Sequence, residues 1–296
     1  MSRVTVPDGT VPAEAGAAAT DGVRAGLPAG SLRHFAALFS GSPQRPLIES
    51  LYAFDAELRR IVAATSHQAA HARLQWWRGE LDRLAAGRPT HPLAQALLPL
   101  RGRRDVDLAR LHEMLVAADL DLAQMTYRSW QELDAYLFRA SGTLQSLIAA
   151  TLAGERGLAP AEREFASRLG AAVRQAEMLA DLRRDLARGR MYAPTEALET
   201  AGIDPVAFAS APGADAGRPF LAGWRDRVRR ELDALPDALD EDSQRRAQRH
   251  GLVLAALHRR WLNGATARAA QCDGLLPEPG PLDRLWTAWR TALRYR

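Results

Sequence analysis

Lysine is missing from this sequence, so all 39 of its basic residues are arginine. Cysteine occurs only once, at Cys272, which excludes an intramolecular disulfide and a zinc site built from cysteines. Such scarcity of cysteine is typical of a reducing compartment, and we expect a cytoplasmic protein. No stretch of about 18 apolar residues occurs either, so no segment is predicted to cross a membrane.

Neither sign of charge dominates any long segment. The 35 acidic residues are interleaved with the 39 arginines, and the net charge is only +4 although the pI is about 9.8. Proteins that bind nucleic acids usually concentrate their basic residues on one segment or face, so this pattern argues against a nucleic-acid partner. A local group of arginines would instead suit a diphosphate or an anionic membrane, which leaves peripheral contact with the inner membrane as an alternative.

The chain divides into a short tail and one long helical region. Residues 1–27 are rich in Ala, Gly, Thr and Asp and lack the basic start and apolar run of a signal peptide, so we predict a disordered tail. Beyond this tail, apolar residues recur at helical spacing almost throughout, as at Leu51, Phe54 and Leu58. The sequence shows no alternating strand pattern and no internal repeat. It therefore predicts a single all-α domain over residues 28–296.

Several helix boundaries can be predicted from Pro, Gly and capping residues. Pro92 and the capping box of Ser129 and Glu132 indicate two helix starts, and Gly189 marks the end of a long helix. Residues 191–220 hold many Pro, Gly and Ala, and we expect a long surface connection with short helical pieces. The remaining pattern predicts helices over about 105–125, 130–153, 160–188, 218–234, 239–270 and 281–294.

The most informative residues lie near the end of a long predicted helix. Asp181 and Asp185 are four residues apart and therefore share one face of that helix with Glu177. Carboxylates at this spacing can bind a hard cation such as Mg²⁺, which in turn binds a diphosphate. Arg184 and Arg188 each follow an aspartate by three residues, so ordinary surface ion pairs are the alternative.

This stretch and several others resemble the squalene and phytoene synthases. The segment from Asp181 to Pro194 is similar to the family's second aspartate-rich motif and the residues that follow it. The similarity extends from about Gly30 to Trp289. Further matching elements are Leu51–Phe54, Leu74–Leu81, Arg88–Leu97, Asp121, Tyr127, Glu132, Tyr136, Gly142, Gly170 and Ala172. The resemblance implies the isoprenoid-synthase fold, a helical bundle around a central cavity.

Active members of this family join two prenyl diphosphates head to head, with Mg²⁺ held between two facing aspartate-rich helices. By resemblance, Asp181 and Asp185 would be catalytic residues and Mg²⁺ ligands. The partner would be a prenyl diphosphate or another isoprenoid lipid. The residues expected to contact this substrate are Tyr52, Asp55, Arg59, Glu177, Arg188, Arg190 and Tyr192.

The first aspartate-rich motif of the family is not matched. Its paired aspartates fall at Arg59 and Arg60, and its third aspartate falls at Ala63. A guanidinium repels Mg²⁺ instead of ligating it, but it can contact a phosphate directly. The segment from Phe54 to Leu58 also resembles catalytically silent relatives, the mitochondrial complex I assembly factors.

Two functions are consistent with this mixture. We expect a divergent member of the family that binds a prenyl diphosphate or related lipid in a helical cavity without full synthase activity, with an assembly-factor-like role as one form of this hypothesis. The alternative is an active Mg²⁺-dependent transferase that joins prenyl diphosphates to make squalene or phytoene. The sequence identifies no protein partner.

Other polar and aromatic residues have simpler explanations. Asp55 and Arg59 can form an ion pair instead of contacting phosphate, whereas Arg60 is expected at the surface. His67 and His71 have the spacing of a metal pair, but no third ligand accompanies them. Five aromatic residues are expected in the core more than in a lipid channel: Tyr127, Tyr136, Trp76, Trp77 and Trp261.

Overall fold

The computed structural model describes residues 26–40, 43–268 and 278–296. Every regular element in these ranges is helical, and no strand occurs among them. The prediction of an all-α fold is therefore confirmed. None of the described helices is both long enough and apolar enough to span a membrane.

The helices differ widely in length. The longer ones are α3 (Arg45–Val62), α4 (His67–Ala85), α6 (Leu111–Leu122), α8 (Thr143–Ala153), α9 (Pro160–Ala187), α12 (Gly217–Ala234), α14 (Arg249–Arg268) and α15 (Pro281–Arg294). The shorter ones are α2 (Leu32–Leu38), α5 (Pro92–Leu97), α7 (Trp130–Leu137), α10 (Thr195–Thr200), α11 (Pro205–Ser210) and α13 (Asp242–Ala247). Helices α10 and α11 are the short helical pieces expected in the connection over 191–220.

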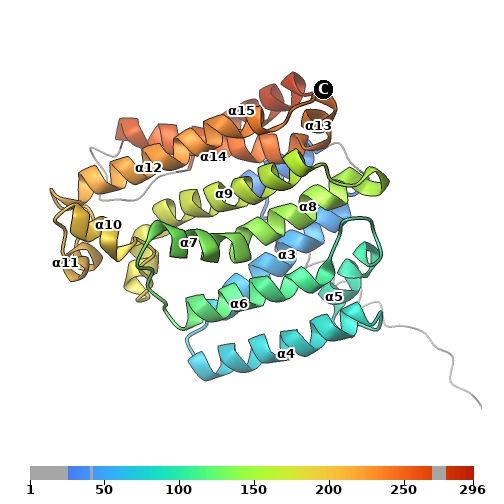
Figure 1. Cartoon of the computed structure of the whole chain (residues 1–296), viewed down its shortest axis with the longest axis horizontal. Coiled ribbons are helices and arrows are strands. Elements are labelled where there is room, and N and C mark those ends of the chain that lie inside the picture. Colours follow the sequence, from blue (N-terminus) through green and yellow to red (C-terminus); the bar gives the residue numbers. More distant parts are fainter. Residues whose placement is uncertain (1–25, 41–42, 269–277) are drawn as a thin grey trace, which may run out of the picture.

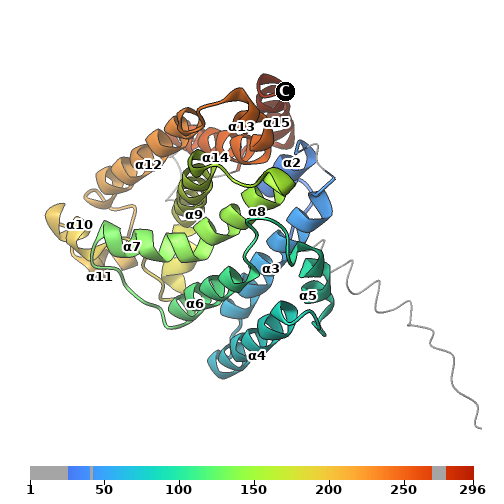
Figure 2. The ribbon, with the colours of Figure 1, turned by 45° about the vertical axis from the view of Figure 1, so that its right-hand side comes forward.

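Helix α9 lies in the middle of the molecule (Figure 1 and Figure 2). It contacts α12 and α14 on one side and α7 and α8 on the other, while α3, α4 and α6 lie beyond α8. Buried apolar side chains form two adjoining groups, one around α9, α12 and α14 and the other around α3, α4 and α6. Polar side chains of α3 and α9 meet between these groups, and this arrangement positions the candidate site.

The predicted start of α7 and end of α9 are confirmed. The Ser129 hydroxyl accepts the N–H of Glu132 at 3.3 Å, and the Glu132 carboxylate accepts the N–H of Arg128 at 2.7 Å. Just beyond α9, Gly189 adopts a φ of +75°, which glycine tolerates because it has no Cβ. The chain turns there and leads into α10.

Two predicted helices are shorter than the pattern indicated. The helix predicted over 105–125 begins only at Leu111, so the prediction was wrong at its N-terminal end. Asp105 has a φ of +58° and its carboxylate accepts the N–H of Leu158 at 2.9 Å, which commits it to a turn. The helix predicted over 239–270 is divided into α13 and α14.

The helix predicted over 130–153 contains a π-helical turn, Phe138–Gly142, which separates α7 from α8. Helix α9 crosses this turn at very close range. A Cβ added to Gly170 would lie 2.3 Å from the carbonyl oxygen of Ser141 and 2.6 Å from the Cα of Gly142. Only glycine fits at position 170 without moving one backbone away from the other.

The first described residues pack against α3. A Cβ on Gly26 would lie 2.2 Å from the backbone nitrogen of Ala53, and Leu27 is buried. The rest of the predicted tail at 1–27, and Cys272, lie outside the described residues. The disordered tail therefore stays a prediction.

Replacing Gly170 by alanine should destabilise the protein by about 2–3 kcal/mol, because the added methyl group must push α9 away from the backbone at Ser141. Urea unfolding followed by circular dichroism measures the change. Gly223 in α12 is the matched control, since nothing lies within 4 Å of its Cβ position. Gly223→Ala should raise stability by about 0.5–1 kcal/mol. An unchanged unfolding midpoint for Gly170→Ala would contradict the close packing.

Candidate functional site

Four charged side chains form a closed ring of ion pairs between α3 and α9. Arg33 of α2 contacts both carboxylates, with Nη1 2.6 Å from Asp55 Oδ2 and Nη2 2.9 Å from Glu177 Oε1. Arg59 contacts the same two groups, with Nε 2.9 Å from Asp55 Oδ2 and Nη2 2.7 Å from Glu177 Oε2. We call these four residues the arginine–carboxylate ring. The ring ties α2 and α3 to α9.

The ring is largely buried, except at Arg59. The side chains of Arg33 and Glu177 are each 13% exposed and that of Asp55 is 10% exposed, whereas that of Arg59 is 34% exposed. Burial alone would raise the pKa of both carboxylic acids. The guanidinium groups of Arg59 and Arg33 outweigh burial and hold both pKa values below the usual range. Both carboxylates are therefore charged at neutral pH and are neutralised within the protein.

A second polar network adjoins the ring at Arg174 of α9. The Arg174 guanidinium lies 3.7 Å from the carboxylate of Glu177 and 3.7 Å from that of Asp121 in α6. Asp121 accepts hydrogen bonds from the hydroxyls of Tyr136, at 2.9 Å, and Tyr192, at 2.7 Å. Burial raises the pKa of both tyrosines, so they stay protonated and act as donors.

A small cavity lies between the ring and the second network. Its polar lining comes from Asp55 and Arg59 of α3, Asp121 of α6, Tyr136 of α7 and Arg174 of α9. Its volume is about 30 Å³, enough for one or two water molecules. Sites for small organic ligands usually measure about 300–1,000 Å³. This cavity is thus too small for such a ligand in the described conformation.

The two aspartates of the predicted metal motif lie in different surroundings. Asp185 is buried and lies 3.8 Å from Arg190, whose Nη2 also donates to the carbonyl of Val62 at 2.8 Å. Asp181 is about one-third exposed and pairs with Arg184. Burial raises the pKa of both aspartic acids in spite of these partners. Asp181 thus forms an ion pair with Arg184, while Asp185 connects α9 to the end of α3 through Arg190.

The other predicted contact residues are not all at one place. Tyr192 belongs to the second network, whereas Arg188 is exposed just beyond the end of α9. Tyr52 contacts the arginine–carboxylate ring through Arg33. The Arg33 guanidinium lies 5.0 Å from the centre of the Tyr52 phenol group. The Tyr52 hydroxyl lies 2.9 Å from Nε2 of His250, and Tyr52 does not line the small cavity. This geometry makes Tyr52 a support for Arg33.

The neighbouring arginines of α3 have opposite surroundings. Arg59 forms the expected pair with Asp55 and also reaches Glu177 on α9. Arg60 is 68% exposed and pairs with Glu57, so its predicted surface position is confirmed. Only one of the two positions that match the first aspartate motif therefore faces α9.

Sequence reasoning missed Arg33 altogether. It lies in a short helix next to the predicted tail, and its partners are 22 and 144 residues away, so no local spacing could reveal it. Asp121 and Tyr136 carried a usable signal, because both belong to elements that match the family's spacing. That signal predicted the family and its fold. The hydrogen bond between the two side chains is evident only in the three-dimensional structure.

The remaining candidates have mixed outcomes. His67 and His71 are exposed, and among the described residues no three His, Cys, Asp or Glu side chains are arranged to hold a metal ion. Of the five aromatic residues expected in the core, four are buried. The exception is Trp76, which is 46% exposed on the outer face of α4, where its neighbour Trp77 occupies the core position.

The carboxylates of the site do not fit a Mg²⁺ site as they are arranged. Asp55 and Glu177 each bind two guanidinium groups, so a cation would have to displace an arginine and lie beside its charge. Asp181 and Asp185 keep the spacing of the metal motif, but each is paired with an arginine. Mg²⁺ binding at these two aspartates stays a prediction.

Comparison with known proteins identifies the family. The pattern of the family described as Squalene/phytoene synthase matches residues 29–288, so the chain belongs to the squalene/phytoene synthase family. Phytoene synthase 3, chloroplastic, from Zea mays is 32% identical over 189 residues, which are 60% of this chain and 43% of that protein. The 15-cis-phytoene synthase from Synechocystis sp. is 27% identical over 165 residues, which are 53% of this chain and 49% of that protein. The chain spans about half the length of the curated relatives it matches.

Solved structures share the fold along almost the whole chain. Squalene synthase HpnC from Alicyclobacillus acidocaldarius has a TM-score of 0.71 at 21% identity, covering 88% of this chain and 97% of that one. A dehydrosqualene synthase in complex with a ligand has a TM-score of 0.72 at 16% identity, covering 95% and 96% of the two chains. At these identities the likeness establishes the isoprenoid-synthase fold and nothing further.

Replacing Glu177 by glutamine should lower the free energy of unfolding at pH 7 by about 3 kcal/mol, because Arg33 and Arg59 lose a buried partner. The pKa of Glu177 is lower in the folded protein than its unfolded value of 4.5. Its contribution is therefore fully present above about pH 4.5 and is lost as the pH falls towards the folded pKa. The stability difference between wild type and variant should shrink by about 2 kcal/mol between pH 4.5 and about pH 3.

Urea unfolding at a series of pH values measures this difference. Glu196→Gln is the control, because Glu196 is an exposed residue that pairs with Arg128 and should contribute less than about 1 kcal/mol at any pH. If the difference for Glu177→Gln stays constant down to about pH 3, the charge of Glu177 does not stabilise the fold.

Proposed function

We propose that this chain binds the diphosphate group of a prenyl diphosphate, or of a related lipid, through arginine side chains and without the Mg²⁺-dependent chemistry of a full synthase. The observation that supports the proposal is the arginine–carboxylate ring. Arg59 stands where the resemblance places an aspartate, on the side of α3 that faces α9, and it binds Glu177. A guanidinium at this position favours an anion over a cation.

Arg59 is the ring member that an incoming anion can recruit. Arg33 is only 13% exposed and contacts both carboxylates, so Asp55 and Glu177 keep a cationic partner when Arg59 turns away. The side chain of Arg59 is 34% exposed. Arg190, which follows α9 in the chain, donates to the carbonyl of Val62 and so lies beside the C-terminal end of α3. A diphosphate at this edge would accept charge-assisted hydrogen bonds from both arginines.

The lipid tail needs more room than the described cavity offers. The cavity of about 30 Å³ has an apolar side formed by Leu58 and Val62 of α3 and by Met114 and Ala117 of α6. Met114 has an unbranched, flexible side chain that can change its packing at low cost. We expect a prenyl tail to enter by displacing Met114 and separating α3 from α6.

The alternative function is an active transferase that makes squalene or phytoene. It is favoured by the retained spacing of Asp181 and Asp185 and by the matched relatives, which are named as phytoene synthases. This function requires the carboxylates of α3 and α9 to be released from their arginines. The described arrangement does not provide such a release.

A non-hydrolysable thiodiphosphate analogue of farnesyl or geranylgeranyl diphosphate should raise the Tm of the protein equally in EDTA and in Mg²⁺, because a ligand that binds only the folded state stabilises it. Arg59→Ala should weaken binding about tenfold or more, since a charge-assisted hydrogen bond is worth about 1.5–3 kcal/mol. Arg60→Ala is the matched control, because Arg60 is the next residue of the same helix and points to solvent. Its ligand-induced shift in Tm should equal that of the wild type.

A product assay separates the two functions. The protein is incubated with farnesyl or geranylgeranyl diphosphate and Mg²⁺, and hydrocarbon product and released diphosphate are measured. Hydrocarbon product, or a Tm shift that occurs only with Mg²⁺, would contradict the proposal and favour the active transferase. Equal shifts for Arg59→Ala and the wild type would remove Arg59 from the binding site.

A further inference from the structure

Helix α15 exposes large apolar side chains along one face. Leu282, Leu285, Trp286 and Trp289 are 82%, 43%, 57% and 43% exposed. Their spacing of three and four residues places them on one stripe of the helix. The buried positions of α15 are instead small, as at Ala288. A surface helix normally turns its large apolar residues inward. The reversed pattern of α15 therefore indicates that the exposed stripe binds another molecule.

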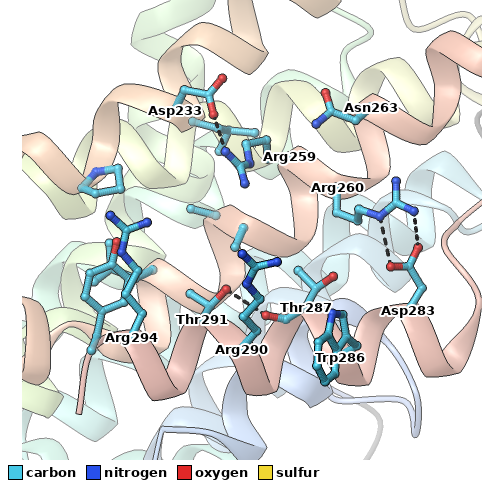
Figure 3. Close-up of a pocket in the computed structure, with 16 residues that line it drawn as sticks. Asp233, Arg259, Arg260, Asn263, Asp283, Trp286, Thr287, Arg290, Thr291 and Arg294 are labelled. Atoms are coloured by element: carbon cyan, nitrogen blue, oxygen red, sulfur yellow. Dashed lines mark hydrogen bonds and ion pairs between the residues drawn. The ribbon is translucent and has the colours of Figure 1, made fainter.

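An arginine-lined groove runs along the same helix. It lies between α12, α14 and α15 and has a volume of about 550 Å³ (Figure 3). Two of its arginines are neutralised, since Arg259 pairs with Asp233 at 2.8 Å and Arg260 pairs with Asp283 at 2.8 Å. Two further arginines, Arg290 and Arg294, also line it.

Arg290 and Arg294 give the groove its net positive charge. Figure 3 shows both side chains extending from α15 into the groove. Neither takes part in an ion pair with any residue of the described part of the chain, and both are exposed. Trp286 lines the groove and also belongs to the apolar stripe. The cationic groove and the apolar stripe are therefore adjacent parts of one surface.

We propose that α15 docks this protein on an anionic lipid bilayer. The apolar stripe enters the boundary between headgroups and acyl chains, where tryptophan is favoured because its ring is amphipathic. Arg290 and Arg294 bind the phosphate groups of anionic headgroups in the groove. A partner protein would need a matching apolar and acidic surface, whereas an anionic bilayer supplies both properties at once. This proposal does not depend on the proposed function.

The test is co-sedimentation of the full chain with vesicles. Vesicles made of equal parts phosphatidylcholine and phosphatidylglycerol should bind the protein at least tenfold more tightly than vesicles of phosphatidylcholine alone. Trp286→Ala with Trp289→Ala, and separately Arg290→Glu with Arg294→Glu, should each weaken binding to the anionic vesicles about tenfold or more. Circular dichroism and Tm should stay unchanged, because all four side chains are exposed.

Matched controls lie at the opposite end of the molecule. Trp76 is 46% exposed on α4, far from α15 in Figure 1, and Trp76→Ala should bind vesicles like the wild type. Arg88→Glu with Arg103→Glu changes the net charge by the same amount as the α15 pair and should have little effect.

Several results would overturn the proposal. Vesicle binding that survives both α15 double variants, or that the control charge pair weakens equally, would exclude a specific surface on α15. A second contrary result would be an absence of vesicle binding together with stabilisation of the wild type by millimolar inorganic diphosphate. If the Arg290→Glu, Arg294→Glu variant is not stabilised in the same way, the groove is a site for a free anion. A third would be a dimer of the wild type in analytical ultracentrifugation, again without vesicle binding. If Trp286→Ala with Trp289→Ala converts this dimer to a monomer, the apolar stripe binds a second copy of the chain.

Discussion

Two largely buried carboxylates determine how the middle of this protein is built. A charged carboxylate inside a helical bundle is costly unless cations and hydrogen-bond donors surround it. Asp55 comes from α3 and Glu177 from α9, and each is bound by both Arg33 and Arg59. Helices α2, α3 and α9 are therefore held in one relative position, because sliding any of them would leave a buried charge without a partner.

The same requirement limits the chemistry of the site. Active members of the family set two carboxylate-rich helices against each other, so that Mg²⁺ can lie between them. Here the α3–α9 interface is neutralised by guanidinium groups, and the cavity beside it holds only about 30 Å³. In the proposed mode of binding, an incoming diphosphate exchanges with an existing ion pair. Arg59 is the member that exchanges at the lowest cost, because it is partly hydrated and Arg33 still covers both carboxylates.

The charges on the surface of α15 are not all neutralised within the described part of the protein. The central site satisfies its charges internally, whereas this surface leaves two arginines and two tryptophans facing outward. Figure 2 shows α15 at the edge of the bundle, where it lies beside α14 and α2. The two proposals therefore concern separate regions, the first the polar end of a ligand and the second the surface of a bilayer. A small buried face of alanines, the ion pair between Arg260 and Asp283 and the hydrogen bond from Arg284 to the carbonyl of Gly30 hold α15 against its neighbours.

Periodicity, capping residues and motif spacing were enough to predict the all-α fold, the family and several helix ends, because each of these is a local property of the chain. The pair between Asp55 and Arg59 was predictable for the same reason, since residues four apart share a helix face. Packing alone decided that Arg59, and not Arg60, reaches Glu177, and that Arg33 completes the ring. These contacts depend on which helix faces meet. The ion pair between Arg33 and Glu177 joins residues 144 positions apart, a distance over which no spacing rule operates.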